Sequence, residues 1–120
     1  MRVLIVEPDQ RLSALWRDNF LRFAEDVFVT SDQAAAVDVL RHHDIAVIVL
    51  DLDLSRGSPL AIADFASYRR PGARIVVVTS GRAFADGSIF RYCPNASAFL
   101  PCATAPEDLA LLVEYQGRAA

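Results

Sequence analysis

The sequence contains no lysine, and all twelve of its basic residues are arginine. This absence excludes chemistry that depends on a lysine side chain, such as Schiff-base formation, phosphate binding by a Walker-type loop and class A β-lactamase-like acylation. Cysteine is also scarce. Cys93 and Cys102 form neither a CxxC pair nor a zinc-binding pattern, so we expect two free thiols.

Long apolar runs are missing as well. No apolar stretch approaches the roughly 20 residues that a membrane span requires, and the N-terminal run meets Glu7 and Pro8 too early for a signal peptide. The net charge of −3 and the dispersed arginines give no sign of nucleic-acid binding. We therefore expect a cytoplasmic protein without direct contact to membrane or nucleic acid.

What the sequence does contain is enough apolar material for a core. Hydrophobic residues make up 53% and charged residues 22% of the 120 positions, which is typical of a folded rather than a disordered chain. No linker, internal repeat or low-complexity tract interrupts it. We expect residues 1–120 to form a single domain.

Short apolar runs alternate with segments that have helical spacing. The runs predict five strands: Arg2–Val6, Val27–Thr30, Ile45–Leu50, Arg74–Thr79 and Ala98–Leu100. A strand–helix alternation repeated five times predicts an α/β fold, namely a doubly wound (βα)5 unit with a five-stranded parallel sheet and helices on both faces.

The helical segments carry start signals and apolar stripes. The first predicted helix has a stripe made of Leu12, Leu15, Trp16, Phe20 and Phe23. The second is expected to begin after Ser31 as its N-cap. It buries Ala35, Ala36, Val39 and Leu40.

Three further helices are predicted. The third begins at Ser58-Pro59, with serine as the cap and proline at the first helical position, and turns Leu60, Ala63 and Ala66 inward. The fifth opens with the capping-box spacing of Thr104–Glu107 and buries Leu109, Leu112 and Val113. The fourth, at 82–93, is expected to be short or irregular because glycines flank or interrupt it.

Acidic residues close two of the predicted strands. Asp51 follows the apolar run Ile45–Leu50, and Glu7 ends the first strand in the same way. Burying a carboxylate costs several kcal/mol unless a nearby group needs it. Because ligands of parallel sheets bind beyond the carboxyl ends of the strands, we expect Glu7, Asp51 and Thr79-Ser80 to line one crevice suited to a phosphoryl group or a metal.

Four segments resemble a known family when they are read in order. They are Val3-Leu4-Ile5-Val6-Glu7, Val49-Leu50-Asp51-Leu52-Asp53-Leu54, Val77-Val78-Thr79-Ser80 and Ala98-Phe99-Leu100-Pro101. Each is common alone, but together they resemble the receiver domain of bacterial response regulators over essentially the whole chain. The resemblance implies a flavodoxin-like receiver architecture and a role in two-component signalling.

The resemblance also implies roles for single residues. Asp51 would accept a phosphoryl group, with magnesium, from a sensor histidine kinase or a phosphotransfer protein. The backbone carbonyl of Asp53 would bind the metal and Glu7 would hold a metal-bound water. Thr79 would hydrogen-bond the phosphoryl oxygens, and the Phe99 ring would rotate with that shift. A carboxylate can attack phosphorus, and hard oxygen ligands suit magnesium.

Two departures from the family pattern indicate an impaired acceptor site. Pro8 replaces the second of two adjacent acids, which weakens the expected magnesium site because proline supplies no carboxylate. Cys102 replaces the lysine that would pair with the phosphoryl group. A charge-assisted hydrogen bond is worth about 1.5–3 kcal/mol, so its loss corresponds to about 10- to 100-fold in rate or affinity.

A second reading therefore stays open beside the switch. The chain could be a phosphorylation-independent pseudo-receiver that acts through protein–protein contacts. Its output partner would bind the face formed by the fourth helix, fifth strand and fifth helix, where Ala83, Phe84, Ile89 and Phe90 supply apolar material. Pairing of two copies of the chain is a further expectation.

Enzymatic readings fit less well. The segment Asp51-Leu52-Asp53-Leu54 also resembles the start of haloacid-dehalogenase-type phosphatases, but that family places the motif after its first strand and needs a later lysine. A flavodoxin-like flavin carrier would need a hydroxyl- and glycine-rich phosphate loop, whereas the turn Glu7-Pro8-Asp9-Gln10 would repel phosphate. We expect a signalling domain rather than an enzyme.

Overall fold

Five parallel strands form the sheet in the computed structural model, which describes residues 1–80, 93 and 95–119. They are β1 (Arg2–Val6), β2 (Asp26–Thr30), β3 (Val47–Asp51), β4 (Arg74–Thr79) and β5 (Ala96–Pro101), in the spatial order β2-β1-β3-β4-β5. All four neighbouring pairs are parallel. The predicted α/β sheet is thus confirmed, with β1 and β4 at the predicted bounds and the other three shifted or longer by one or two residues at their ends.

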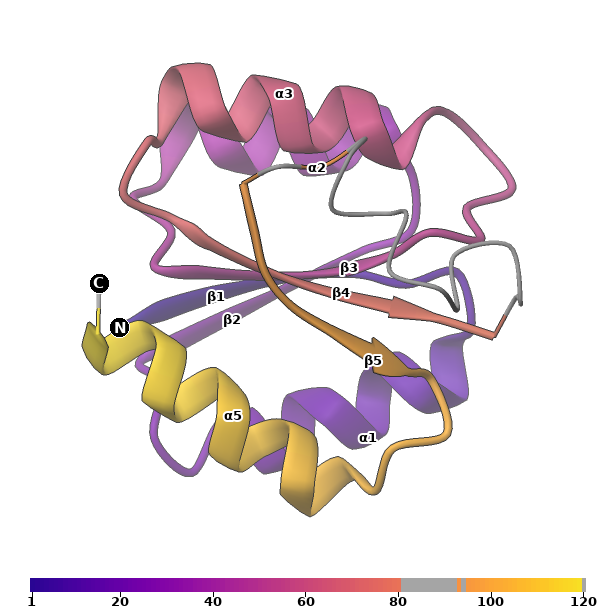
Figure 1. Cartoon of the computed structure of the whole chain (residues 1–120), viewed down its shortest axis with the longest axis vertical. Coiled ribbons are helices and arrows are strands. Elements are labelled where there is room, and N and C mark those ends of the chain that lie inside the picture. Colours follow the sequence, from indigo (N-terminus) through magenta and orange to yellow (C-terminus); the bar gives the residue numbers. More distant parts are fainter. Residues whose placement is uncertain (81–92, 94, 120) are drawn as a thin grey trace.

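Helices cover both faces of this sheet, as a doubly wound fold requires (Figure 1). The helices α2 (Gln33–His42) and α3 (Pro59–Arg69) lie on one face, and α1 (Gln10–Phe20) and α5 (Pro106–Ala119) on the other. Because parallel strands must be joined by crossover connections, the chain returns through α1, α2 and α3 between the first four strands, and the described helices bury the sheet on both sides.

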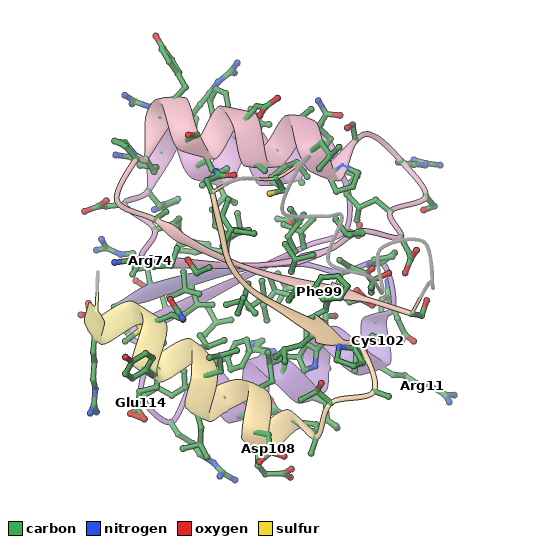
Figure 2. The ribbon with its side chains drawn as sticks, viewed as in Figure 1. Arg11, Arg74, Phe99, Cys102, Asp108 and Glu114 are labelled. Atoms are coloured by element: carbon green, nitrogen blue, oxygen red, sulfur yellow. The ribbon has the colours of Figure 1, made fainter. Side chains whose placement is uncertain are left out.

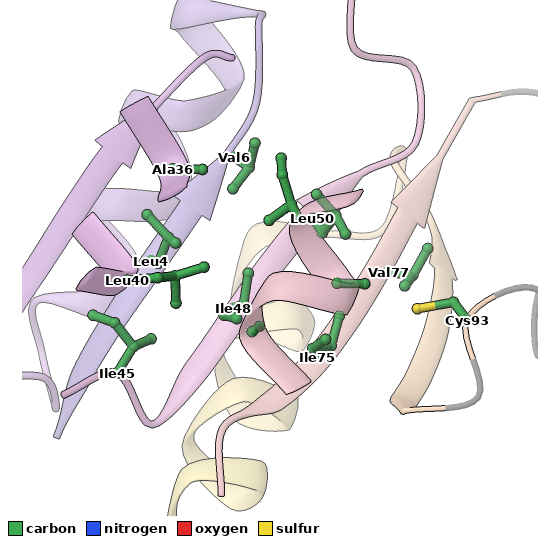
Figure 3. Packing of buried hydrophobic residues seen from close by; sticks show 13 residues of the cluster. Leu4, Val6, Ala36, Leu40, Ile45, Ile48, Leu50, Ile75, Val77 and Cys93 are labelled. Carbon is green, nitrogen blue, oxygen red and sulfur yellow. The ribbon is translucent and has the colours of Figure 1, made fainter. Parts of the chain in front are cut away.

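Two hydrophobic layers result from the alternation of side chains along each strand. Leu4, Ile48 and Ile75 pack under α2 and α3 (Figure 3), whereas Val3 and Val76 pack under α1 and α5. Successive strand residues point to opposite faces, so a strand buried on both sides reads as an unbroken apolar run. This is the physical reason why β3 is apolar at every position before Asp51.

The helix starts show which capping predictions hold. Ser58 caps α3 as predicted, with its hydroxyl accepting from the Ala61 N–H at 3.2 Å. The prediction for α2 is wrong by one residue: Asp32 is the N-cap, and its carboxylate accepts from the Ala35 N–H at 2.8 Å. Both Ser31 and Asp32 can cap a helix, and the sequence alone does not decide between them.

The predicted capping box of α5 is not formed. The helix begins at Pro106, and the Thr104 hydroxyl donates instead to the Pro101 carbonyl oxygen at 2.7 Å. Proline is favoured at the first helical position because it needs no N–H partner there. The start of α5 therefore lies two residues after Thr104.

Two predicted burial patterns also need correction. In α1 the stripe is confirmed for Trp16 and Phe20, which are fully buried, but Leu15 is 49% exposed. In α3, Ala63 and Ala66 are buried as predicted, but the third buried residue is Ile62, and Leu60 is only partly buried. Each helix presents a narrower face to the sheet than a count of apolar residues suggests.

The predicted fourth helix, 82–93, lies outside the described residues except for Cys93, and so do Ala83, Phe84, Ile89 and Phe90. Cys93 is buried against the layer beneath α2 and α3. Among the described helices, none has the length and apolar character to cross a bilayer.

Candidate functional site

The carboxyl edge of the sheet gathers buried polar side chains from three central strands. Glu7 follows β1, Asp51 is the last residue of β3 and Thr79 is the last residue of β4. They are 3%, 5% and 6% exposed, respectively. The structure thus brings together the side chains that the sequence placed in one crevice, and we call Glu7, Asp51, Thr79 and their neighbour Asp53 the acidic rim.

Glu7 and Asp51 interact directly within this rim. The pKa of Glu7 is raised to about 9, first by burial and then by the hydrogen bond and the negative charge of Asp51. The Asp9 N–H, which bonds to the Glu7 carboxyl group, acts in the opposite direction. Glu7 therefore keeps its proton at neutral pH, as one member of a close pair of carboxyl groups does.

The rim partly fits the magnesium ion that the resemblance implies. Glu7 Oε2 is buried and has no hydrogen-bond partner among the described residues, so an oxygen is left over for a cation or its water. Mg²⁺ keeps several waters and needs only one or two protein carboxylates. No group of three or more acidic, histidine or cysteine side chains in the described residues could hold a metal by itself.

The Asp53 side chain makes contacts that the sequence reading did not foresee. Its Oδ2 accepts hydrogen bonds from the Thr79 hydroxyl at 3.1 Å, from the Ser80 N–H at 2.9 Å and from the Ser80 hydroxyl at 2.9 Å. The Asp53 N–H donates to Asp51 Oδ1 at 2.8 Å. Asp53 was singled out only for its backbone carbonyl, and no local pattern signals a contact to a residue so distant in the chain.

The loop that carries Asp53 is fixed at its other end as well. The Ser58 N–H donates to the Gln33 side-chain oxygen at 2.8 Å, next to the start of α2. Gly57 has φ +89°, a left-handed conformation that glycine adopts without steric cost. The segment between β3 and α3 is thus tied to β4 at one end and to α2 at the other.

Pro8 supplies no carboxylate at the position where the resemblance would place a second acid, and the side chain of the following acid has another partner. Asp9 is the N-cap of α1, with its carboxylate accepting from the N–H groups of Arg11 and Leu12 at 3.0 and 3.3 Å. A carboxylate bound to the start of a helix stabilises that helix. The Asp9 side chain therefore caps the N-terminus of α1.

Cys102 stands at the end of β5 and faces the rim. Its N–H donates to the Thr79 carbonyl oxygen at 3.0 Å. Burial raises the pKa of its thiol, and the charges of Asp51, Glu7 and Asp53 raise it further. The thiol is therefore neutral at the position where the resemblance would place a lysine, and it offers no positive charge to a phosphoryl group.

Phe99 lies on β5 opposite Val77 of β4. Its ring is partly buried and packs against the layer beneath α2 and α3. Figure 2 shows Phe99 and Cys102 towards the same end of β5. Phe99 thus connects the strand next to the rim with the hydrophobic core.

Solved structures of receiver domains resemble this chain closely in fold. A response regulator receiver domain protein from Methanospirillum hungatei matches with a TM-score of 0.87 and 18% identity, covering 98% of this chain and 94% of that one. The receiver domain of a putative Luxo repressor protein from Vibrio parahaemolyticus matches with a TM-score of 0.84 and 20% identity, covering 98% and 90%.

A third similar structure has a modified aspartate. It is a response regulator protein from Burkholderia pseudomallei with a phosphorylated aspartic acid, a calcium ion and citrate. The TM-score is 0.81 at 17% identity, covering 98% of this chain and 69% of that one.

The sequence matches no protein-family model and no curated protein. The chain therefore has the flavodoxin-like fold of response-regulator receiver domains, as the sequence resemblance predicted.

Proposed function

We propose that this chain is a receiver domain, spanning residues 1–120, in which Asp51 accepts a phosphoryl group in a two-component or phosphorelay pathway. The observation that carries the proposal is the buried carboxylate of Asp51, at the end of β3 and beside Glu7 and Thr79, in a chain with the receiver fold. The domain is proposed as a signalling module and not an enzyme.

The chemistry assigned to the rim is nucleophilic transfer. A carboxylate oxygen of Asp51 attacks the phosphorus of a phosphohistidine on a sensor kinase or phosphotransfer protein, the P–N bond breaks, and the imidazole leaves with its electron pair. Glu7, Asp51 and the Asp53 carbonyl would hold magnesium, which supplies positive charge to the phosphoryl oxygens. Thr79 would donate to those oxygens, and Phe99 would respond on β5.

The site is proposed to work weakly. Pro8 leaves the rim without a second adjacent acid, and the neutral Cys102 provides no charge-assisted hydrogen bond. This observation favours a second candidate function, in which the chain is a phosphorylation-independent interaction module. In both cases an output protein or a second copy of the chain would use the face that includes β5 and α5, in the cytoplasm.

Intact-mass measurement tests the switch. The protein is incubated with magnesium and a small phosphodonor, and a mass gain of one phosphoryl group is expected in the wild type. The gain should vanish in Asp51→Asn and persist in Asp44→Asn, a control that changes an exposed aspartate away from the rim. No gain and no magnesium binding would remove the acceptor role and leave the interaction module.

A further inference from the structure

Asp53 gathers three donors on one carboxylate oxygen. The Thr79 hydroxyl, the Ser80 N–H and the Ser80 hydroxyl all point to Asp53 Oδ2 at distances between 2.9 and 3.1 Å. Backbone and hydroxyl donors that converge in this way form an anion-binding site. The end of β4 is thus an anion site, and a carboxylate of the chain itself fills it.

The contact is not explained by helix capping. The N-cap of α3 is Ser58, which lies further along the loop. The Asp53 N–H is bound to Asp51, so the backbone of Asp53 is fixed while its side chain reaches across to β4. An exposed aspartate needs no protein partner, because water solvates it well. Its carboxylate nevertheless takes three protein donors.

One of these donors is the Thr79 hydroxyl, and the Ser80 N–H and hydroxyl bind the same carboxylate oxygen beside it. Under the proposed function, on which this inference rests, Thr79 donates to the phosphoryl oxygens. The Asp53 N–H bond to Asp51 Oδ1 places the two aspartates side by side. A phosphoryl group on Asp51 and the carboxylate of Asp53 therefore compete for the Thr79 hydroxyl.

We propose that Asp53 is a built-in anion that occupies the oxyanion site of Thr79 and Ser80, so that these residues stay in an anion-bound arrangement without phosphorylation. A switch needs two states that differ in what fills this site, since a ligand shifts an equilibrium only through its differential binding. With the Asp53 carboxylate bound, an anion fills the site of Thr79 and Ser80 both before and after phosphorylation of Asp51. Phosphorylation therefore changes the arrangement of Thr79 and Ser80 little.

The proposal is tested by the chemical shift and the hydrogen exchange of the Ser80 amide in NMR spectra of the full chain. Asp53→Ala keeps the backbone carbonyl but removes the carboxylate, so the Ser80 amide signal should shift and its hydrogen exchange should accelerate about 10-fold or more. Added formate should restore the wild-type shift in Asp53→Ala and leave the wild type unchanged. Asp44→Ala, which changes an exposed aspartate away from the rim, should have no effect.

Two results would overturn the inference. One is an unchanged Ser80 amide in Asp53→Ala. The other is a Ser80 amide that moves as far in the wild type as in Asp53→Ala when Asp51 is modified by a phosphodonor or beryllofluoride. If Asp53→Ala does not fold, the neutral isostere Asp53→Asn carries the test, with a smaller shift in the same direction expected.

The two proposals fail separately. If Asp51 is never modified but the Ser80 amide responds to Asp53→Ala and to formate, the built-in anion stands and the acceptor role falls. If both hold, removal of Asp53 should speed modification of Asp51 by about 10-fold, because the Thr79 hydroxyl no longer donates to the Asp53 carboxylate.

Discussion

Two carboxyl groups share a nearly water-free position at the acidic rim. Glu7 and Asp51 are 3% and 5% exposed, and the pKa of Glu7 is raised to about 9 by burial and by Asp51. Two ionised carboxylates close enough to share a hydrogen bond would repel each other strongly. The rim therefore holds a proton on Glu7, and this property is set by two single residues.

The protonated Glu7 predicts an unusual dependence of stability on pH. The folded pKa lies above the ordinary value of 4.5, so the folded chain keeps a proton that the unfolded chain releases. The free energy of unfolding, measured with urea in the absence of magnesium, should fall by about 1.4 kcal/mol per pH unit at most between pH about 4.5 and 9. In Glu7→Gln the dependence in this window should largely disappear.

A matched control tests this reading. Glu107→Gln removes an exposed carboxylate on α5 and should leave the wild-type slope in place. Equal slopes in the wild type and Glu7→Gln would show that Glu7 does not hold the proton.

Cys102 gives a second prediction at the level of one residue. If the neutral thiol limits the acceptor site, Cys102→Lys should raise the rate of Asp51 modification by a small phosphodonor by about 10- to 100-fold, because it restores a charge-assisted hydrogen bond. Cys102→Met lengthens the side chain without charge and should not raise the rate. Time-resolved intact mass measures both, and equal rates in the two variants would contradict the prediction.

At the scale of elements, α1, α2 and α3 begin at a side chain that accepts from free N–H groups, and α5 begins at a proline, which has no N–H that needs a partner. For α2 this group is Asp32, not the neighbouring serine. The loop between β3 and α3 also uses a carboxylate to accept from a backbone N–H group. Its Asp53 binds the end of β4 rather than the start of a helix. The rim is thus built from connections between elements as much as from strand ends.

The cap of α2 can be tested with two adjacent substitutions. Asp32→Ala should lower the free energy of unfolding by about 1 kcal/mol, within a range of about 0.5–2, because the Ala35 N–H loses its partner. Ser31→Ala should change it by less than about 0.5 kcal/mol. Urea unfolding of both variants measures the two free energies of unfolding. A larger loss in Ser31→Ala than in Asp32→Ala would show that Ser31 is the cap.

At the scale of the whole molecule, the sheet is buried from both sides. Ile48 lies beneath α2 and α3 and Val49 beneath α1 and α5, and both are fully buried. A chain with one covered face would need only every second residue of β3 to be apolar. The two layers therefore share the stability of the fold.

Truncations on the two sides of β3 should both be costly. Ile48→Ala should lower the free energy of unfolding by about 2–5 kcal/mol and Val49→Ala by about 1.5 kcal/mol or more. Val29→Ala, on the edge strand β2, changes a side chain that is 44% exposed and should cost far less. A neutral Val49→Ala would mean that the layer beneath α1 and α5 contributes little.

The topology was predictable because a strand that is buried on both faces appears in the sequence as an unbroken apolar run. Unbroken apolar runs before Glu7 and Asp51 identify central strands, and the parallel order brings their carboxyl ends together. Exposure of Leu15 and the exact start of α5 were missed, because they depend on helix rotation and local turns. The Asp53 contacts were missed because they join residues that only the folded chain brings together.

The positions of the chain ends have a practical consequence. Met1 lies against Gly117 of α5, so the start of β1 and the last turn of α5 lie on the same side of the molecule (Figure 1). The rim lies beyond the opposite end of β1, roughly 17 Å away by strand length. A fluorophore attached near the last turn of α5 would leave the rim open in a binding assay. A tag before Met1 would instead remove the amino group that pairs with Glu25 at 3.0 Å.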